Sequence, residues 1–324
     1  MAKCSGSTSG ARNRLPEALI RLYTHPACLL HDPGPDHPES PARLRAVLDA
    51  LDHDHFAALD RVEAPRASRK QLLRVHTPEH LARVLEARPD EHRLRLDEDT
   101  VMSADSAEAA LRAAGAVIAA VDAVMSGACE RAFCAVRPPG HHATAETPMG
   151  FCLFNSVAVA AAHALSEHRL KRIAIVDFDV HHGNGTQDIF AREPKVLYVS
   201  SHQAPLYPDT GEATETGVGN LVNAPLPPGT RSQEFRQIWD GLLLPRLHDF
   251  RPQLVLVSAG FDAHRRDPLA ELQLEAEDFA WLTSRLMQLA DAHAGGRLVS
   301  SLEGGYDLSA LAASSAAHVQ ELMS

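Results

Sequence analysis

The chain has 324 residues, of which 45% are apolar and 23% are charged, as in a folded globular protein. This composition excludes a collagen and a wholly disordered chain. Acidic residues outnumber basic ones by 42 to 31, and the resulting net charge of −11 disfavours direct binding to nucleic acid and favours cationic partners.

We expect no membrane-spanning segment, because Asp122 interrupts the best candidate stretch, residues 113–125. The first fourteen residues contain Ser, Gly and Arg but no acidic residue and no apolar core, and we expect residues 1–19 to form a tail. An organelle transit peptide is the alternative for this segment. Five cysteines, an odd number without a CxxC pair, predict reduced thiols and a cytoplasmic location.

Residues 20–324 contain no repeat, charge block or long linker, which predicts a single domain. Short apolar runs predict strands at residues 132–136, 172–180, 196–200, 254–258 and 297–302. Amphipathic or Ala-rich stretches predict helices at residues 104–125, 157–167, 232–249, 276–293 and 308–322. Asn155 and Ser156 are suited to cap the second helix. This alternation predicts an α/β fold with a central, mainly parallel sheet flanked by helices.

Each predicted strand is followed by residues suited to chemistry. These segments are RPPGHH (137–142), DFDVHHGNG (177–185), SSH (200–202), SAGFD (258–262) and EGGY (303–306). In open parallel sheets, ligands bind beyond the carboxyl ends of the strands, because loops and helix termini converge there. We therefore expect His, Asp and Tyr side chains to meet at one edge of the sheet and form an active site.

Asp177, Asp179 and His181 are spaced by two, so their side chains share one face of an extended segment. Two carboxylates and an imidazole on one face call for a cation, and Asp262 is the best candidate for a further ligand. Three protein ligands with a position left for water are typical of a catalytic divalent metal such as zinc. A solvated strand end is the alternative, which the apolar run before Asp177 disfavours.

Two further features indicate a hydrolytic site. His141 and His142 follow a Pro-Pro-Gly turn, and an imidazole there can accept a proton from water and return it to a leaving amine. Tyr306 follows two glycines, where a phenol can donate a hydrogen bond to an oxyanion. Among the other histidines, His202 is expected to pack at a strand end. Five more lie in polar stretches and are expected to be solvated: His53, His55, His76, His80 and His92.

Taken together, these motifs resemble the histone deacetylase superfamily. The shared segments are RPPGHHA (137–143), GFCLFN (150–155), DFDVHHGNGTQ (177–187), SAGFDAHRRDPL (258–269) and LEGGYDL (302–308). HPESPARL (37–44) matches the family's N-terminal segment, so the resemblance extends from about residue 23 to the C-terminus. It is closest to the class II and bacterial histone deacetylase-like amidohydrolase branch, to which acetylpolyamine amidohydrolases are related.

The resemblance implies the arginase/deacetylase fold and a role for each matching residue. It implies one zinc ion held by Asp179, His181 and Asp262. It implies His142 as general base and acid, His141 as its electrostatic partner hydrogen-bonded to Asp177, and Tyr306 as the group that polarises the substrate carbonyl. It also implies a substrate tunnel lined by Gly150, Phe151, Tyr207 and Leu269, and an exit channel for acetate at Arg43. A structural potassium ion is implied at Asp177, Asp179, His181, Ser200 and Ser201.

Two positions select a branch of the family. Asn184 stands where class I enzymes carry an Asp behind the general-base histidine, and class II relatives share this Asn. An amide orients the ring but does not stabilise its protonated form as a carboxylate does. Position 306 is Tyr and not the His of the weakly active class IIa enzymes, which favours deacetylase activity.

The expected reaction is zinc-dependent hydrolysis of an acyl amide, with acetyl-lysine in proteins or peptides as the first substrate. A small acetylated polyamine is the alternative, but Leu269 lies where polyamine-selective relatives place a Glu that reads the distal ammonium. A catalytically silent acyl-lysine-binding protein is a remote alternative, disfavoured because the expected metal ligands and Tyr306 are all present. The sequence leaves the acyl-chain preference and the oligomeric state open, with a dimer or tetramer among the options.

Overall fold

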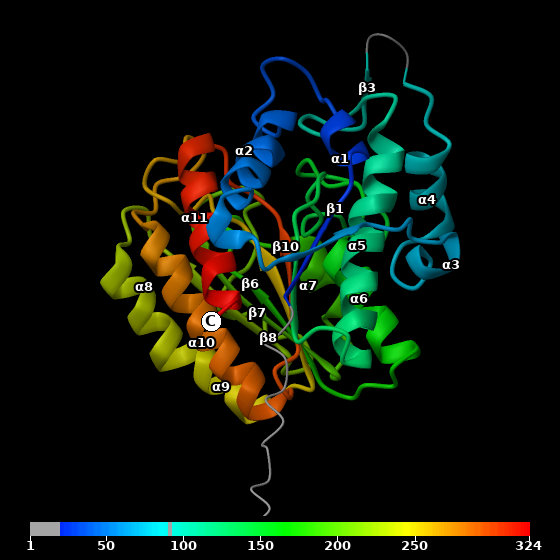
Figure 1. Cartoon of the computed structure of the whole chain (residues 1–324). Helices are drawn as coiled ribbons and strands as arrows, with labels where there is room; N and C mark the ends of the chain where they lie inside the picture. Colours follow the sequence, from blue (N-terminus) through cyan, green and yellow to red (C-terminus); the bar gives the residue numbers. More distant parts are fainter. Residues whose placement is uncertain (1–19, 90–92) are drawn as a thin grey trace, which may run out of the picture.

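The structure is a computed structural model that describes residues 20–89 and 93–324. The expected tail at residues 1–19 and His92 lie outside the described residues. Eight strands form one sheet, and all of its neighbouring strands run parallel (Figure 1). Their order across the sheet is β2 (Asp60–Glu63), β1 (Ile20–Thr24), β5 (Arg131–Cys134), β10 (Leu298–Leu302), β9 (Leu254–Ala259), β6 (Ile173–Asp177), β7 (Val196–Gln203) and β8 (Leu221–Leu226).

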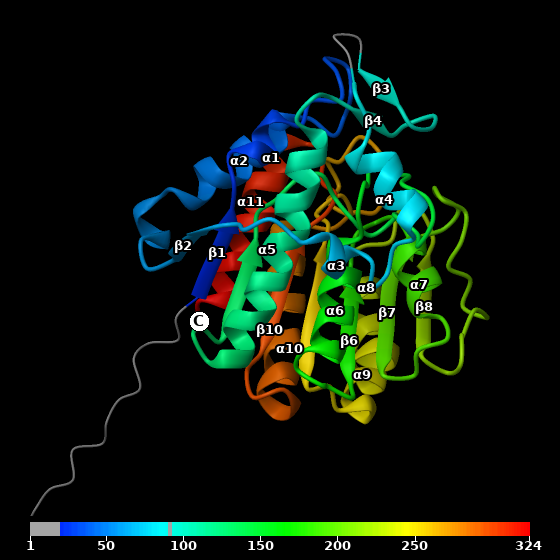
Figure 2. The same cartoon turned by 90° about the vertical axis from the view of Figure 1, so that its right-hand side faces the viewer.

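Helices cover both faces of this sheet (Figures 1 and 2). One face carries α2 (Pro41–Leu51), α8 (Ser232–Ile238), α9 (Leu244–Phe250), α10 (Ala276–His293) and α11 (Leu308–Leu322). The other carries α3 (Arg69–Leu72), α4 (Pro78–Leu85), α5 (Ser106–Ser126), α6 (Ser156–Ser166) and α7 (Asn184–Phe190). Four short elements complete the fold: α1 (Ala27–Leu30), the 3₁₀-helix η1 (Asp54–Phe56) and the antiparallel pair β3 (Leu94–Arg95) and β4 (Val101–Met102). The predicted α/β architecture is confirmed.

The five predicted strands correspond to β5, β6, β7, β9 and β10. All five are buried along their whole length, and each contains a short apolar run that marks it in the sequence. The sequence analysis missed β1, β2 and β8. The edge strand β2 has the sequence Asp-Arg-Val-Glu and is half-exposed, so it lacks that signal.

Among the described residues, α5 alone is long and apolar enough to cross a membrane by length and composition. In the fold, 67% of its apolar window is buried, and the helix contacts α6, β1 and β5. Asp122, which interrupts the apolar stretch, lies on its exposed side. The apolar character of α5 is therefore accounted for by its place in the core.

The predicted helix at 232–249 is divided into three segments. Between α8 and α9, residues Trp239–Leu243 form a π-helical turn, and the N–H of Leu244 donates to the carbonyl of Trp239. Pro245 has no N–H and cannot make the usual α-helical bond to Gly241, so the backbone widens just before it. Trp239 fills the widened turn and is fully buried.

Two expectations about local structure have different outcomes. Asn155 caps α6 as predicted, because its side chain accepts a hydrogen bond from the N–H of Ala158 at 3.0 Å. The prediction that His76 and His80 are solvated is wrong, since both are buried. His76 Nε2 accepts from the N–H of Asn155 at 2.9 Å, and His80 Nε2 donates to the carbonyl of Leu153 at 2.7 Å. His76 Nδ1 also donates to the carbonyl of Thr144 at 2.9 Å, so both nitrogens of that ring are bonded, whereas among the described residues His80 is bonded through Nε2 alone.

His318 on α11 gives the fold a specific acid sensitivity. Its ring is fully buried between Thr283 Oγ1 at 2.6 Å and Ser300 Oγ at 2.8 Å. The Thr283 hydroxyl donates to the carbonyl of Phe279, so it accepts from His318 Nδ1–H. Nε2 then accepts from Ser300. Burial lowers the pKa of His318 to about 3.

We expect acid to destabilise the protein partly through His318. Below the unfolded-state pKa of about 6.5, the unfolded chain binds a proton that the folded chain does not, so folded-state stability falls as the pH drops toward 3. The expected loss is about 1.4 kcal/mol per pH unit. Urea unfolding of the wild type and His318→Asn is the measurement. The stability difference between them should shrink between about pH 7 and pH 5, whereas a constant difference contradicts this assignment.

Candidate active site

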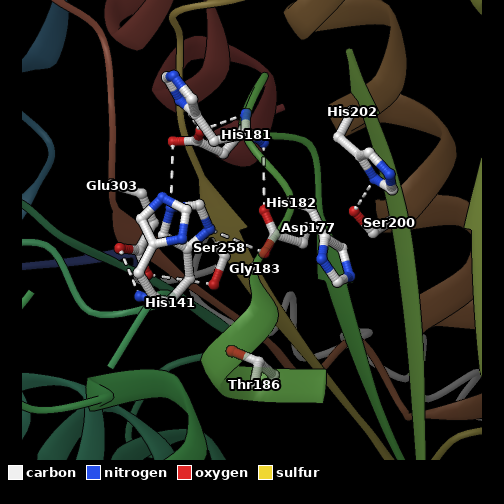
Figure 3. A network of polar contacts seen from close by, with 12 residues as sticks. His141, Asp177, His181, His182, Gly183, Thr186, Ser200, His202, Ser258 and Glu303 are labelled. Carbon is white, nitrogen blue, oxygen red and sulfur yellow. Dashed lines mark hydrogen bonds and ion pairs between the residues drawn. The ribbon is translucent and has the colours of Figure 1, made fainter. Parts of the chain in front are cut away.

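The carboxyl ends of β5, β6, β9 and β10 bring the expected site residues to one edge of the sheet. Figure 3 shows His141 close to Asp177 and Glu303 there, with the ring of His181 directed away from these three residues. Asp177 lies opposite Ser258 in the β6–β9 register, and Ser258 lies opposite Ser301 in the β9–β10 register. The register of these parallel strands therefore aligns the loops that follow them.

Asp179, His181 and Asp262 form a group whose candidate ligand atoms all lie within 4.8 Å of one another. His181 Nδ1 is 3.1 Å from Asp179 Oδ1 and 3.1 Å from Asp262 Oδ2. Both carboxylates are buried, and among the described residues neither forms an ion pair with a lysine or arginine. Two buried like charges this close need a cation or shared protons. The expected ligand set is thus assembled at one point.

Backbone groups hold these carboxylates in place. Asp179 Oδ2 accepts from the N–H of Gly304 at 2.8 Å, and Asp262 Oδ1 accepts from the N–H of Val180 at 2.9 Å. A Cβ on Gly304 would lie 2.0 Å from Asp262 Oδ2, and one on Gly260 would lie 2.0 Å from Asp179 Oδ2. Only glycine fits at these two positions, because the backbone approaches the carboxylates so closely.

His141 is held by a buried carboxylate. Its Nδ1 lies 3.0 Å from Asp177 Oδ2, which also accepts from the Tyr198 hydroxyl at 3.0 Å. Burial disfavours the charged imidazole, but the nearby carboxylates of Asp179 and Asp177 prevail and raise the pKa of His141 well above its usual value. The expected His141–Asp177 contact is therefore present, with Tyr198 as a third member.

His142 has a different partner. Its Nδ1 lies 2.8 Å from Asn184 Oδ1, an oxygen that only accepts, so Nδ1 carries the proton and Nε2 keeps its lone pair. Burial and the neighbouring imidazoles of His141 and His181 lower the pKa of His142 well below its usual value. The His142 side chain lines the main cavity of the site.

Glu303 is a site residue to which the sequence analysis gave no role. Its Oε2 accepts from the N–H of Gly140 at 2.6 Å and of His141 at 3.2 Å, and its Oε1 accepts from Ser258 Oγ at 3.1 Å (Figure 3). Glu303 thereby fixes the backbone that carries the two histidines. A signal was available, because an acidic residue that directly follows a buried strand needs such partners.

Tyr306 is held from both sides of its loop. Arg43 is fully buried, donates to the carbonyls of Glu303 and Gly305 at 2.5 Å each, and lies 4.8 Å above the Tyr306 ring. On the other side, Asp267 accepts from the N–H of Tyr306 at 2.7 Å. Burial raises the pKa of Tyr306 well above its usual value, so the phenol is protonated. The structure places Arg43 behind this ring, and its expected link to an exit channel stays a prediction.

A second set of buried contacts holds Arg43. Arg43 Nη1 donates to Glu39 at 2.9 Å, and Arg137 binds the same carboxylate through two nitrogens. His31 Nε2 approaches Glu39 to 3.2 Å. Despite the cost of burial, the positive charge of Arg137 and the hydrogen bond from His31 hold the pKa of Glu39 well below its usual value. One buried anion therefore anchors two buried guanidinium groups.

The cavity that reaches the candidate metal-binding group has a volume of about 260 Å³. All four expected tunnel residues line it, together with Asp99 and Leu206, which the sequence analysis did not identify: Asp99, His142, Gly150, Phe151, His181, Leu206, Tyr207, Leu269 and Tyr306. Gly150 has φ +55°, and a Cβ there would lie 2.5 Å from the His142 ring. Glycine thus lets the wall of the cavity approach His142.

The residues expected around potassium also lie together. Asp177 pairs with Ser200 in the β6–β7 register, and Ser201 follows directly. Ser200 Oγ bonds His202 Nδ1 at 2.9 Å (Figure 3), and Trp239 Nε1 donates to Ser201 Oγ at 3.2 Å. His202 is buried and donates from Nε2 to the carbonyl of Gly211, in agreement with the packing role expected for it.

Known proteins resemble this chain over most of its length. The histone deacetylase domain family matches residues 37–322. A probable deacetylase of Archaeoglobus fulgidus is 40% identical over 294 residues, which cover 89% of this chain and 81% of that protein. The histone deacetylase-like amidohydrolase of Pseudomonas aeruginosa is 42% identical, over 83% of this chain and 72% of its own length. The crystal structure of the HDA15 HD domain superposes with a TM-score of 0.89 at 35% identity, covering 95% of this chain and 88% of that one. The chain therefore belongs to the histone deacetylase family.

Proposed function

We propose that this chain is a zinc-dependent deacetylase that hydrolyses the acetyl amide of acetyl-lysine in peptides or proteins and releases acetate. The observation that carries the proposal is that His142, Tyr306 and His181 of the candidate metal-binding group line one cavity. Membership of a family of deacetylases and amidohydrolases supports acyl-amide chemistry at this point.

The donor set fits Zn²⁺. One imidazole and two carboxylates are ligands that zinc accepts, and three protein ligands leave a position for water or substrate. In this proposal Asp179, His181 and Asp262 hold the ion, which also neutralises the two buried carboxylates. When bound, Zn²⁺ supplies Lewis-acid chemistry that makes water a stronger acid and the acyl oxygen a better acceptor of charge.

His142 is suited to move the proton in this reaction. Because Asn184 fixes the proton on Nδ1, the free Nε2 can take a proton from the attacking water. The same nitrogen then returns that proton to the leaving lysine amine, so the amide C–N bond breaks without a free amide anion. Glu303 and Asp177 keep the His141–His142 segment in position throughout.

Tyr306 is suited to stabilise the acyl oxygen. Its protonated phenol can donate a hydrogen bond as negative charge develops on that oxygen. Asp267 and Arg43 fix the loop that carries the phenol, so the hydroxyl is held ready for the acyl group and need not be ordered during the reaction.

The shape and chemistry of the cavity favour an acyl-lysine chain. Phe151 and Tyr207 offer aromatic walls, and Leu206 and Leu269 offer aliphatic ones, which suit the methylene groups of lysine. An acetylpolyamine carries a second ammonium group beyond its amide. Leu269 is apolar and cannot pair with that ammonium group. Asp99 is the one acidic residue among the described residues that line this cavity.

The test is turnover of the zinc-loaded chain on an acetyl-lysine peptide and on acetylputrescine or acetylspermidine, side by side, measuring released acetate. We expect a higher kcat/KM on the peptide. A preference for either polyamine contradicts the substrate assignment while leaving the hydrolytic chemistry intact. Absence of acetate release from all three substrates contradicts the proposed activity itself.

We also propose that a structural potassium ion binds at Asp177, Asp179, His181, Ser200 and Ser201. The support is the family resemblance and the proximity of these residues at the ends of β6 and β7. Replacing K⁺ with Na⁺ in the buffer should lower the melting temperature of the chain. An unchanged melting temperature at equal ionic strength contradicts a bound potassium ion.

Asp267 is expected to act on catalysis through Tyr306. Its buried carboxylate accepts from the N–H of Tyr306 at 2.7 Å and from the N–H of the tunnel residue Leu269 at 3.0 Å. Asp267→Asn retains one acceptor oxygen and loses the other. We expect kcat to fall by about tenfold with a smaller change in KM, because the phenol is misplaced by a fraction of an ångström.

A double-mutant cycle separates this positioning role from a general loss of structure. In a Tyr306→Phe background, Asp267→Asn should lower kcat no further, because the group on which it acts is gone. Equal effects of Asp267→Asn in both backgrounds contradict the positioning role.

A further inference from the structure

A second group of metal-ligating side chains lies at the other end of α6 from the candidate active site. Asp122 of α5, His163 near the C-terminus of α6, and His168 just beyond that helix present three candidate ligand atoms within 4.8 Å of one another. The N-cap of α6, Asn155, bonds the active-site segment through the carbonyl of Ala143 at 3.2 Å. His163 follows it by eight residues, about 12 Å along the helix axis.

We propose that Asp122, His163 and His168 form a second divalent-metal site, with the ligand preference of Zn²⁺. The Nε2 atoms of both histidines lie 2.7 Å from the same oxygen, Asp122 Oδ1. The two rings therefore point their Nε2 atoms toward the same carboxylate oxygen. Two imidazole nitrogens and one carboxylate oxygen are a known zinc ligand set, in which the fourth position is left to water.

The geometry needs only a small adjustment to accept an ion. Zinc–nitrogen and zinc–oxygen bonds are about 2.0–2.2 Å, so the three atoms must separate slightly as the metal replaces the two shared protons. The side chain of Asp122 is 51% exposed and that of His168 is 24% exposed, so both can move and water can reach the ion. The buried ring of His163 is the fixed ligand of the three.

One neighbouring contact, between Arg74 and His163, opposes metal binding at this site. Arg74 Nη1 lies 3.1 Å from His163 Nδ1, and Arg74 also pairs with Glu167. A metal on Nε2 requires the proton to be on Nδ1, where it would face the Arg74 donor. Arg74 must then turn away from the ring and keep only Glu167. Binding therefore competes with the Arg74–His163 contact.

The experiment measures Zn²⁺ binding to the full chain without a histidine tag, by equilibrium dialysis and metal analysis. We expect two zinc equivalents in the wild type. His168→Ala and Asp122→Asn should each lower the affinity for the second Zn²⁺ ion by at least about tenfold. Both variants should leave deacetylase turnover unchanged. Asp262→Ala should remove the first equivalent and keep the second, so failure of this site and failure of the proposed catalytic site are distinguishable.

Two further variants make the test sharper. Arg74→Gln removes the opposing donor and offers an oxygen that can accept from His163 Nδ1–H. This variant should therefore raise the affinity for the second Zn²⁺ ion by about tenfold. His248→Ala is the matched control, because His248 and His293 form another exposed histidine pair, at 3.0 Å, and its loss should change nothing. One equivalent in the wild type, or a second equivalent that survives His168→Ala, overturns the proposal.

Discussion

Replacing Tyr306 with phenylalanine is expected to lower kcat on an acetyl-lysine peptide by about a hundredfold or more, which is the usual cost of losing one oxyanion donor. The phenylalanine ring can keep its place beneath Arg43, because the 4.8 Å contact involves the ring and not the hydroxyl. The backbone bond to Asp267 also survives, since it is made by the N–H of residue 306. The substitution therefore removes one hydrogen-bond donor and little else.

Three measurements complete this prediction. Zinc content should stay at the wild-type value, because Tyr306 is not among the three ligand residues. The melting temperature should change little, and KM should change less than kcat, because the lost interaction forms mainly as charge develops on the acyl oxygen. Full turnover by Tyr306→Phe would falsify the role assigned to the phenol.

The second large effect is expected at Asp262. Asp262→Ala removes one of the three proposed zinc ligands, so the chain should lose the proposed catalytic zinc ion and all measurable turnover. Metal analysis after gel filtration is the direct measurement. Retention of that ion would mean that Asp262 is not a ligand.

Loss of fold is a competing cause of inactivity, and a second variant separates it. Asp262→Asn keeps an oxygen that can accept from the N–H of Val180, so the bond that positions the loop is retained. It should melt near the wild type yet bind zinc more weakly. Asp240→Asn, at an exposed ion pair with Arg285, is the surface control and should change neither property.

Much of the catalytic edge could be predicted because its residues follow buried strands. The apolar runs located five of the eight strands, and the two-residue spacing of Asp177, Asp179 and His181 indicated a metal-binding face. The sequence did not reveal contacts between segments far apart in the chain. Asp267 lies 39 residues from Tyr306, and Glu303 lies 163 residues from Gly140. Only folding brings each pair together, so no local pattern marks them.

The histidines show the same limit in another way. His76 and His80 lie among polar residues in the sequence, yet both are buried against Phe154. Their burial depends on contact with residues 153–155, which lie more than 70 positions away in the chain, so it is a tertiary property. In contrast, the helix cap at Asn155 involves residues three positions apart, so the residue type alone was enough to predict it.

The strand order has a consequence for how the protein is made. β10 lies between β5 and β9, so it is the only strand that joins the half-sheet β2-β1-β5 to the half-sheet β9-β6-β7-β8. Residues 298–302 follow all the other strands of the sheet in the chain, so both half-sheets leave the ribosome before them. Until β10 follows, each half-sheet has an unpaired inner edge, which is a surface prone to wrong pairing. A chain cut short before Leu298 thus lacks the strand that joins the two half-sheets, and it also lacks Tyr306.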